Sequence, residues 1–457
     1  YYPLHFSPNH YVNLSFWTML LIKNATLYSP ELLGKKDILV GGGKILAIEN
    51  RIELDGPEIS VWDAEGKILT PGFIDQHIHI TGAGGKRGFA SMTPEIQIST
   101  LIACGTTTVV GLLGTDGSTR SVNSVFSKAK ALTTEGITAY MYTGYYGIDP
   151  VYLMDTVQED MIFIDIVLGC KVAITDTRSS YPTDLELLRL LRQVRVGGMI
   201  GNKKGVLHLH LGGLKSKMDV LFRLVEEHEF PIENISPTHV GRTKELFDEA
   251  IRFAKLGGMI DITTGASQYD KPYKSVLYAL EQGVPMETMT FSSDGNAGLD
   301  KLDENGEFIG FRKAPIDQNW LQTKALIETG KVELAEALKL ITSNPAKNLG
   351  LENKGTIAVG ADADFCGLDS EYMVNVFKSA GIDFKVAIIS YGAYNKHDTQ
   401  FAFRYCESQG ITPIVIDVDM DQFISSGKLL EIATSAKCCA YQIPSIMHAL
   451  TKIDGTI

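Results

Sequence analysis

The chain has 457 residues, of which 44% are hydrophobic and 44 are glycine, enough for one large domain with smaller ones beside it. Its formal net charge of −12 argues against a nucleic-acid partner, because such proteins carry basic surfaces. Six cysteines without a CxxC pair fit a reducing cytoplasm, and the apolar segment 11–22 is too short to span a membrane.

The N-terminal part of the chain divides into an extension and a run of short strands. Met19 opens the first strand, so we expect residues 1–18 to be a non-native or upstream extension. Between residues 19 and 71, alternating hydrophobic stretches break at glycines, as strands and hairpins do. This segment is therefore predicted to belong to a small β domain.

From residue 72 to about residue 300, strand-like runs alternate with amphipathic helical stretches. The candidate strands cover 72–79, 106–113, 137–144, 169–175, 205–211, 235–240, 258–264 and 289–294. Eight β/α units favour a closed (β/α)8 barrel of the TIM type over an open sheet. Helices over 318–350 complete this barrel, so the predicted hydrolase domain is 72–350.

The segments that flank the barrel have the pattern of short strands again. Residues 354–365 have the composition of a hairpin, and with 351–380 they are expected to join 19–71 in a β-sandwich-like domain. The tail over 382–457 has an α/β pattern instead of a run of short strands. Its segment 384–419 indicates a strand, loop, helix and strand, weakly similar to an ATP pyrophosphatase, and we interpret it as a truncated second domain. The adjacent Cys438 and Cys439 in this tail are expected to be inert.

The chemistry begins with two histidines in "GFIDQHIH". His77 and His79 are two residues apart, so on a strand they point to the same face and can bind one cation. The alternative is a pair of partly buried polar residues without a ligand. Catalytic groups of a parallel barrel gather at the C-terminal strand ends, where this motif falls.

Lys171 is the second unusual residue, because its strand "CKVAIT" is otherwise apolar. An unpaired buried ammonium group is unfavourable, so one interpretation is an ion pair with a carboxylate such as Asp176. The other is a carbamylated lysine that bridges two metals, since a buried lysine with a depressed pKa can react with CO₂.

Further candidate ligands end later strands. His208 and His210 share one face of a strand, so periodicity does not choose between them. His239 follows "PT" at another strand end, and Asp294 ends "MTFSSD" before a turn. Asp294 can ligate a metal and move a proton, although an aspartate before glycine is also common as a turn cap.

These segments together resemble the amidohydrolase superfamily and, within it, the isoaspartyl dipeptidases. The match runs from about residue 19 to about residue 378, and "GFIDQHIH" alone is typical of the whole superfamily. The more specific motifs are "GTTTVVGLLGTD", "TGYY", "GCKVAITDTRSS", "LHLG", "PTHVGR", "FSSDGN" and "KGTIAVGADAD". The resemblance implies that His210, and not His208, is the ligand.

The resemblance also implies a set of roles. One Zn²⁺ would be held by His77, His79 and Asp294, a second by His210 and His239, and a carboxylated Lys171 would bridge them. Asp294 would move the proton, and Tyr146 would stabilise the oxyanion. The implied substrate-binding residues are Thr115, Arg178, Arg242, Lys86 and Gly84, with the arginines suited to carboxylates.

Two positions depart from the family pattern. Lys86 in "GAGGKRG" stands where relatives have a glutamate that meets the substrate ammonium, and Gly298 stands where they tend to have a serine. A lysine there would repel a free α-amine, so we expect weak activity on β-aspartyl dipeptides.

The expected function is hydrolysis of an amide bond in small acidic substrates, most of all β-aspartyl dipeptides. The alternatives are N-acylated amino acids, cyclic amides as in dihydroorotase or hydantoinase, a related deaminase, and a non-catalytic binding protein. Arg178 and Arg242 favour acidic substrates over bases such as adenine, and the complete ligand set argues against a binding protein. We expect a cytoplasmic homo-oligomer with a small-molecule substrate and no nucleic-acid or membrane partner.

Overall fold

The computed structural model describes residues 19–85, 87–266, 269–367, 387–390 and 414–417. The chain separates into two units, 1–368 and 369–457. In the second unit, strand β17 (Ala387–Ser390) pairs in parallel with β18 (Ile414–Asp417). Both strands fall within the segment expected to form a strand, loop, helix and strand. Cys438 and Cys439 lie outside the described residues, as does the extension 1–18.

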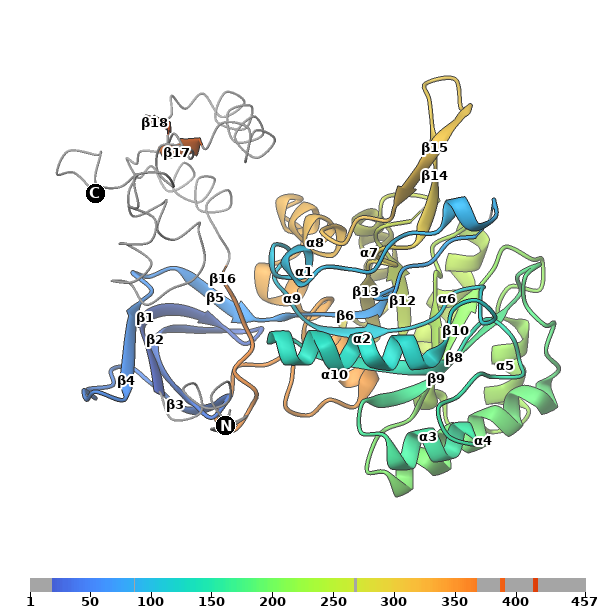
Figure 1. Ribbon diagram of the computed structural model, residues 1–457, viewed down its shortest axis with the longest axis horizontal. Coiled ribbons are helices and arrows are strands. Elements are labelled where there is room, and N and C mark those ends of the chain that lie inside the picture. Colours follow the sequence, from blue (N-terminus) through green and yellow to red (C-terminus); the bar gives the residue numbers. More distant parts are fainter. Residues whose placement is uncertain (1–18, 86, 267–268, 368–386, 391–413, 418–457) are drawn as a thin grey trace, which may run out of the picture. The chain divides into compact units, whose positions relative to one another are not determined.

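The first unit is built on eight parallel strands that follow one another around a barrel (Figure 1). They are β6 (Phe73–Ile78), β7 (Thr106–Gly111), β8 (Thr138–Gly144), β9 (Val167–Ile174), β10 (Val206–Leu211), β11 (Ile235–Thr238), β12 (Ile260–Thr263) and β13 (Met289–Ser292). A bridge between Ile78 and Gly295 joins the first strand to the end of the last, and His79 N donates to Gly295 O at 3.0 Å. The predicted (β/α)8 barrel is confirmed, and each of its eight strands overlaps a predicted run.

Helices connect and cover these strands. They are α1 (Ile98–Ile102), α2 (Val122–Glu135), α3 (Val157–Phe163), α4 (Asp184–Ile200), α5 (Asp219–Glu226), α6 (Lys244–Lys255), α7 (Pro272–Glu281), α8 (Gln318–Glu328), α9 (Leu334–Lys339) and α10 (Ser343–Leu349). Local sequence fixes several ends: Thr183 and Glu186 form a capping box at the start of α4, and Gly136 ends α2 with φ 117°.

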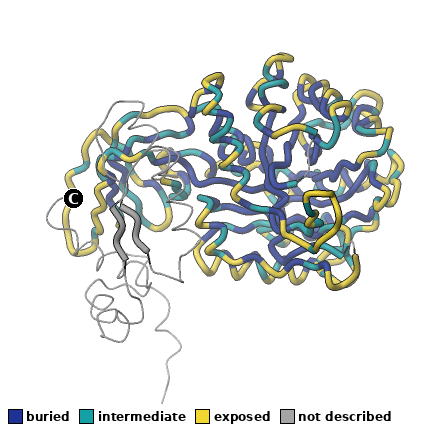
Figure 2. Tube along the Cα trace, turned by 90° about the horizontal axis from the view of Figure 1, so that it is seen from above, coloured by how far each residue is buried: buried dark blue, intermediate teal, exposed yellow. Residues whose placement is uncertain are grey.

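The barrel strands are buried along their length, which explains their continuous apolar runs. Every residue of β6, β9 and β10 is buried, including the histidines and Lys171. Figure 2 shows these buried stretches at the centre of the barrel, with the exposed residues on its outer helices and loops. The polar side chains inside the barrel therefore require an explanation beyond packing.

The described part of the small domain is one six-stranded sheet. Its order is β16-β5-β1-β2-β3, with β4 beside β1. The strands are β1 (Met19–Tyr28), β2 (Leu32–Gly41), β3 (Lys44–Glu49), β4 (Ile59–Asp63), β5 (Ile68–Pro71) and β16 (Phe365–Gly367). Ile22, Leu27, Ile38 and Ile45 pack with Ile357 in its core.

The hairpin expected over 354–365 is wrong. Within the described residues this segment is mostly loop, with one bridge from Asp362 to Lys44, and it ends in β16, which pairs with β5. The buried amine of Lys354 donates to Asp364, Asp362 and, on the barrel, Thr138 at 2.7 Å. These bonds tie the segment to the barrel through one cation.

A hairpin forms where none was predicted. Strand β14 (Gly298–Leu302) pairs with β15 (Phe308–Lys313) directly after the loop that carries Asp294.

Among the helices of the described residues, none combines the length and the hydropathy that crossing a membrane requires.

Candidate active site

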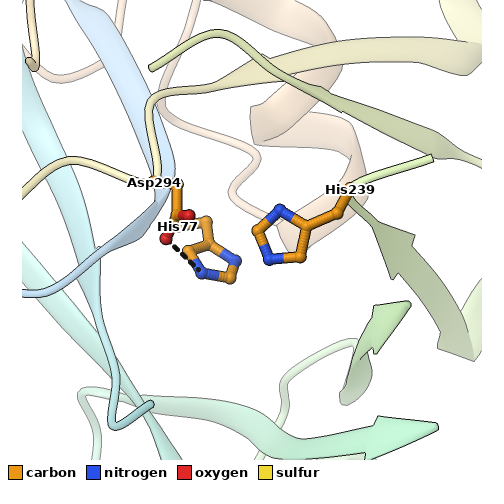
Figure 3. Close-up of side chains that lie close together, drawn as sticks. All are labelled: His77, His239 and Asp294. Atoms are coloured by element: carbon orange, nitrogen blue, oxygen red, sulfur yellow. Dashed lines mark ion pairs between the residues drawn. The ribbon is translucent and has the colours of Figure 1, made fainter. Parts of the chain in front are cut away.

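His77 and His79 face the same carboxylate at the C-terminal end of β6. Their Nε2 atoms lie 3.3 and 3.2 Å from Oδ1 of Asp294, and both imidazoles are buried. Asp294 follows β13 with φ 50°, and the neighbouring Gly295 closes the barrel against β6. Barrel closure therefore brings the first and last strand ends together, as Figure 3 shows for His77 and Asp294.

His239 approaches this group from β11, across the barrel (Figure 3). Its ring centroid lies 4.8 Å from that of His77 and 4.5 Å from that of His210. Its Nδ1 lies 2.6 Å from Oγ1 of Thr263, which leaves Nε2 to face His77 and Asp294. The ligand atoms of His77, His239 and Asp294 all lie within 4.8 Å of one another, so these three residues could hold a metal ion.

Burial keeps His77 and His239 neutral, and Asp294 is held ionised. Burial lowers the pKa of His77 to about 3 and the pKa of His239 well below its usual range. Burial acts to raise the pKa of Asp294, but hydrogen bonds from His77 and His79 hold that pKa far below its ordinary value. Neutral imidazoles and a carboxylate are the forms that bind a cation.

Lys171 lies beneath these groups on β9 and is completely buried. Its Nζ is 3.4 Å from Nδ1 of His77, and burial lowers the pKa of the amine to about 7. Asp176, the expected ion-pair partner, instead bonds Arg178 and His210. The ion-pair interpretation of Lys171 is therefore wrong, since within the described residues no carboxylate forms an ion pair with it.

The structure separates the two histidines of β10. His210 lines the cavity, where its Nδ1 is 2.8 Å from the hydroxyl of Tyr146. Its Nε2 is 3.0 Å from Oδ2 of Asp176. His208 lies deeper, with its two ring nitrogens 2.8 Å from Nδ1 of His77 and 3.2 Å from Oγ of Ser236.

Asp176 is a site residue that the sequence analysis named only as a possible partner of Lys171. It lies two residues after the end of β9 and two residues before Arg178, in "TDTR". Burial acts to raise its pKa, but hydrogen bonds from His210 and Arg178 hold the pKa far below its usual range. The carboxylate thus stays ionised and holds both His210 and Arg178 in place.

The cavity above these groups has a volume of about 150 Å³ and carries two arginines. Arg178 donates to both oxygens of Asp176 and, through NH1, to Thr115 Oγ1 at 3.3 Å. Arg242 lies with NH2 3.3 Å from His210 Nε2, and its buried Nε has no partner among the described residues. An unpartnered guanidinium nitrogen at a cavity wall is suited to an acidic ligand.

A second cavity of about 430 Å³ shares part of this wall. Gly84, Thr115 and Arg178 line both cavities, and the second adds the apolar Phe89 and Met92. Space is therefore available beyond the Arg178 side of the site.

Of the two departures from the family pattern, the structure places one, Gly298, at this wall. Lys86 is outside the described residues. Gly298 lines the first cavity, and a Cβ built on it would lie 2.9 Å from Cα of Gly84. Glycine at 298 therefore permits a close approach of the two backbones that a serine would not allow without movement.

Histidines, a lysine and an aspartate gathered at the C-terminal strand ends of a (β/α)8 barrel define a barrel enzyme with a candidate metal centre. The comparisons with known proteins identify its family. A model of the amidohydrolase family matches residues 204–403. A crystal structure of a beta-aspartyl dipeptidase from Fervidobacterium islandicum, in complex with beta-Asp-Leu, is 41% identical with a TM-score of 0.72. The alignment covers 78% of this chain and 93% of that chain.

Relatives that are named for other activities are more distant. A dihydroorotase from Elusimicrobium minutum is 25% identical over 400 residues, 76% of this chain and 88% of the relative. A D-hydantoinase from Rhizobium radiobacter is 24% identical over 419 residues, 79% of this chain and 88% of the relative. The chain therefore belongs to the amidohydrolase family and is a hydrolytic enzyme.

Proposed function

We propose that this enzyme is a binuclear metal-dependent dipeptidase that cleaves the amide bond of β-aspartyl (isoaspartyl) dipeptides. The observation that carries the proposal is one cavity in which potential metal ligands meet two arginines, Arg178 and Arg242. A β-aspartyl dipeptide has two carboxylates, so the pair of guanidinium groups matches its charge. The 41% identity to a beta-aspartyl dipeptidase supports the same substrate class.

The proposed metals are two Zn²⁺ ions held by six side chains. One set is His77, His79 and Asp294, and the other is His210 and His239, with Lys171 as a carbamate shared by both. The donor set fits, because burial leaves His77, His210 and His239 neutral and Lys171 has no carboxylate partner among the described residues. Bound divalent ions would supply acidified water and polarise the scissile carbonyl.

The protein's own groups would bind the substrate and move the proton. The two arginines would hold the substrate carboxylates. Burial raises the pKa of Tyr146, so its hydroxyl stays protonated at neutral pH and can donate to the developing oxyanion. Asp294, ionised in the resting site, would accept the proton of the attacking water and deliver it to the leaving amine. Thr115 and the backbone at Gly84 would position the amino end.

A second candidate substrate class is N-acylated amino acids or cyclic amides. Two observations favour it: the second cavity beside Arg178 has room for an added group, and the more distant relatives are named dihydroorotase and D-hydantoinase. Lys86 also favours this class, because a cation where the family pattern has a glutamate would repel a free α-amine. The cytoplasmic location and the homo-oligomer also stay predictions.

Hydrolysis of a matched set of substrates tests the proposal. We expect the zinc-loaded enzyme to cleave β-Asp-Leu with a higher kcat/KM than N-acetyl-β-Asp-Leu, dihydroorotate or hydantoin, and to leave the isomer α-Asp-Leu intact. Cleavage of a cyclic amide without cleavage of β-Asp-Leu would replace the dipeptidase with the alternative.

A further inference from the structure

His208 lies directly behind His77, and its ring is held on every side. Its Nε2 is 2.8 Å from Nδ1 of His77, and its Nδ1 is 3.2 Å from Oγ of Ser236. The imidazole is completely buried and stacks on Tyr142, with ring centroids 4.8 Å apart and planes inclined by 13°. Because both ring nitrogens of His208 contact His77 or Ser236, neither is available to a ligand in the cavity.

The contact continues into a buried polar network beneath the site. Asn348 Nδ2 donates to Oγ of Ser236 at 2.9 Å and to Oε1 of Gln76 at 2.8 Å. Gln76 Nε2 donates in turn to the buried carboxylate of Asp261 at 2.8 Å. Ser236 is thereby fixed, and the two lone pairs of its hydroxyl can accept from both Asn348 and His208.

The protons of this network can be arranged in one way that suits a ligand at His77. Nε2 of His77 faces the carboxylate of Asp294 at 3.3 Å, so a cation bound between them would use the lone pair of Nε2. The proton of a neutral imidazole must then be on Nδ1. That N–H needs a buried acceptor, and Nε2 of His208 lies at hydrogen-bond distance.

The same arrangement satisfies His208. If its Nε2 accepts from His77, the proton of His208 is on Nδ1 and is donated to Ser236. The other neighbour of His77 Nδ1 is Lys171 Nζ, at the longer distance of 3.4 Å. His208 therefore supplies the closer partner, and the hydrogen bonds run from His77 to His208 to Ser236 with both ring nitrogens of His208 engaged.

We propose that His208 is a positioning residue that holds His77 in its Nδ1–H tautomer and so leaves Nε2 free to ligate a metal. The proposal rests on the proposed metal centre and adds a role for the histidine that is not itself a ligand. Groups that orient a ligating histidine in this way typically change metal affinity by roughly 10-fold to 100-fold when they are removed. The effect should fall on metal affinity and kcat, because His208 does not line the substrate cavity.

Two variants separate this role from packing. His208→Gln keeps an oxygen acceptor near the position of Nε2, whereas His208→Met has a similar length and only a weak sulphur acceptor. Ser236→Ala removes the next acceptor in the network with almost no change in volume. The thermal midpoint of each metal-free protein records any damage to the fold.

The decisive measurement is the zinc affinity of each purified variant by competition with a chromophoric chelator. We expect His208→Met to weaken the affinity of one site about 10-fold or more, with His208→Gln near the wild type and Ser236→Ala between them. Equal losses of zinc affinity in the His208→Met and His208→Gln variants, or no loss in either, would overturn this role of His208. Neither result would contradict the metal centre itself. Wild-type protein that binds no zinc would overturn the metal centre and this role together.

Discussion

Oδ2 of Asp176 lies 3.0 Å from Nε2 of His210, and the same carboxylate binds the guanidinium of Arg178 through both oxygens. One buried anion thus links a proposed metal ligand to a proposed substrate-binding residue. The Nε2–H of His210 is fixed by this bond, which turns Nδ1 toward the cavity, where it meets Tyr146.

Asp176→Asn should therefore weaken metal binding and substrate binding together. The amide keeps the size of the side chain but removes the charge that holds His210 and Arg178. We expect a loss of roughly 10-fold or more in zinc affinity, with a higher KM for β-Asp-Leu. Chelator competition and steady-state kinetics measure the two effects, and wild-type values for both would show that Asp176 serves only to end β9.

Lys171→Ala should be inactive and poor in metal. The buried amine has no anionic partner among the described residues, so the substitution removes the group that would carry the carbamate. A short carboxylic acid such as propionate should restore part of the activity by supplying two oxygens. Metal analysis and rescue kinetics check this, and a variant with wild-type metal content and rate would disprove the carbamate.

Lys86→Glu should improve the cleavage of free-amine dipeptides. Removal of a like charge from the amino end is worth on the order of 1 kcal/mol, which corresponds to about tenfold in kcat/KM for β-Asp-Leu. N-acetyl-β-Asp-Leu should respond in the opposite direction. Lys301→Glu, the same charge change on the exposed face of the β14–β15 hairpin, is the control and should leave both values unchanged. An equal response of the two substrates would argue that Lys86 does not face the amine.

Lys354→Met should destabilise the fold without touching the site. Lys354 is 8% exposed, and its amine joins Asp362 and Asp364 of the loop before β16 to Thr138 of the barrel. Removing the amine takes the cation from Asp364 and leaves Asp362 with Lys44 alone, so we expect a loss of roughly 3 kcal/mol in the free energy of unfolding at pH 7. Lys244→Met, which breaks an exposed pair with Asp248, should lose far less, because solvent screens that pair.

The pH dependence of this loss has a definite sign. Burial acts to raise the pKa of Asp362, but hydrogen bonds from Lys354 and Lys44 hold that pKa below its usual range. The contribution of Asp362 to the free energy of unfolding is therefore complete above the unfolded pKa of about 4. It is lost as the pH falls through the folded pKa. The difference between wild type and Lys354→Met in urea unfolding should shrink on acidification, and a difference that grew would contradict the ion pair.

The sequence predicted the barrel because its strands are buried on both faces and appear as apolar runs of the correct length. It predicted that His77 and His79 share a face because the period of a strand is two residues. The same period cannot distinguish His208 from His210. The two histidines differ in their depth along the barrel axis. His208 contacts His77 and Ser236, whereas His210 contacts Tyr146 and Asp176.

Other features depend on contacts that no local pattern records. Asp176 could be paired with Lys171 on sequence grounds, yet it turns to Arg178 and His210 at the cavity. The β14–β15 hairpin was not predicted, because its strands are largely exposed and lack the alternation that a buried face imposes. The loop before β16 has the composition of a hairpin, but its contacts are long-range: Lys354 bonds Thr138 of the barrel, and Asp362 bridges to Lys44.

Titration of metal-free enzyme with Zn²⁺ tests the central claim most directly. The proposed ligand set predicts that β-Asp-Leu hydrolysis rises from zero and reaches its plateau at two equivalents of zinc per chain. His210→Ala should bind only one equivalent and lose nearly all turnover. A plateau at one equivalent, or hydrolysis by the metal-free enzyme, would contradict a binuclear centre built from these residues.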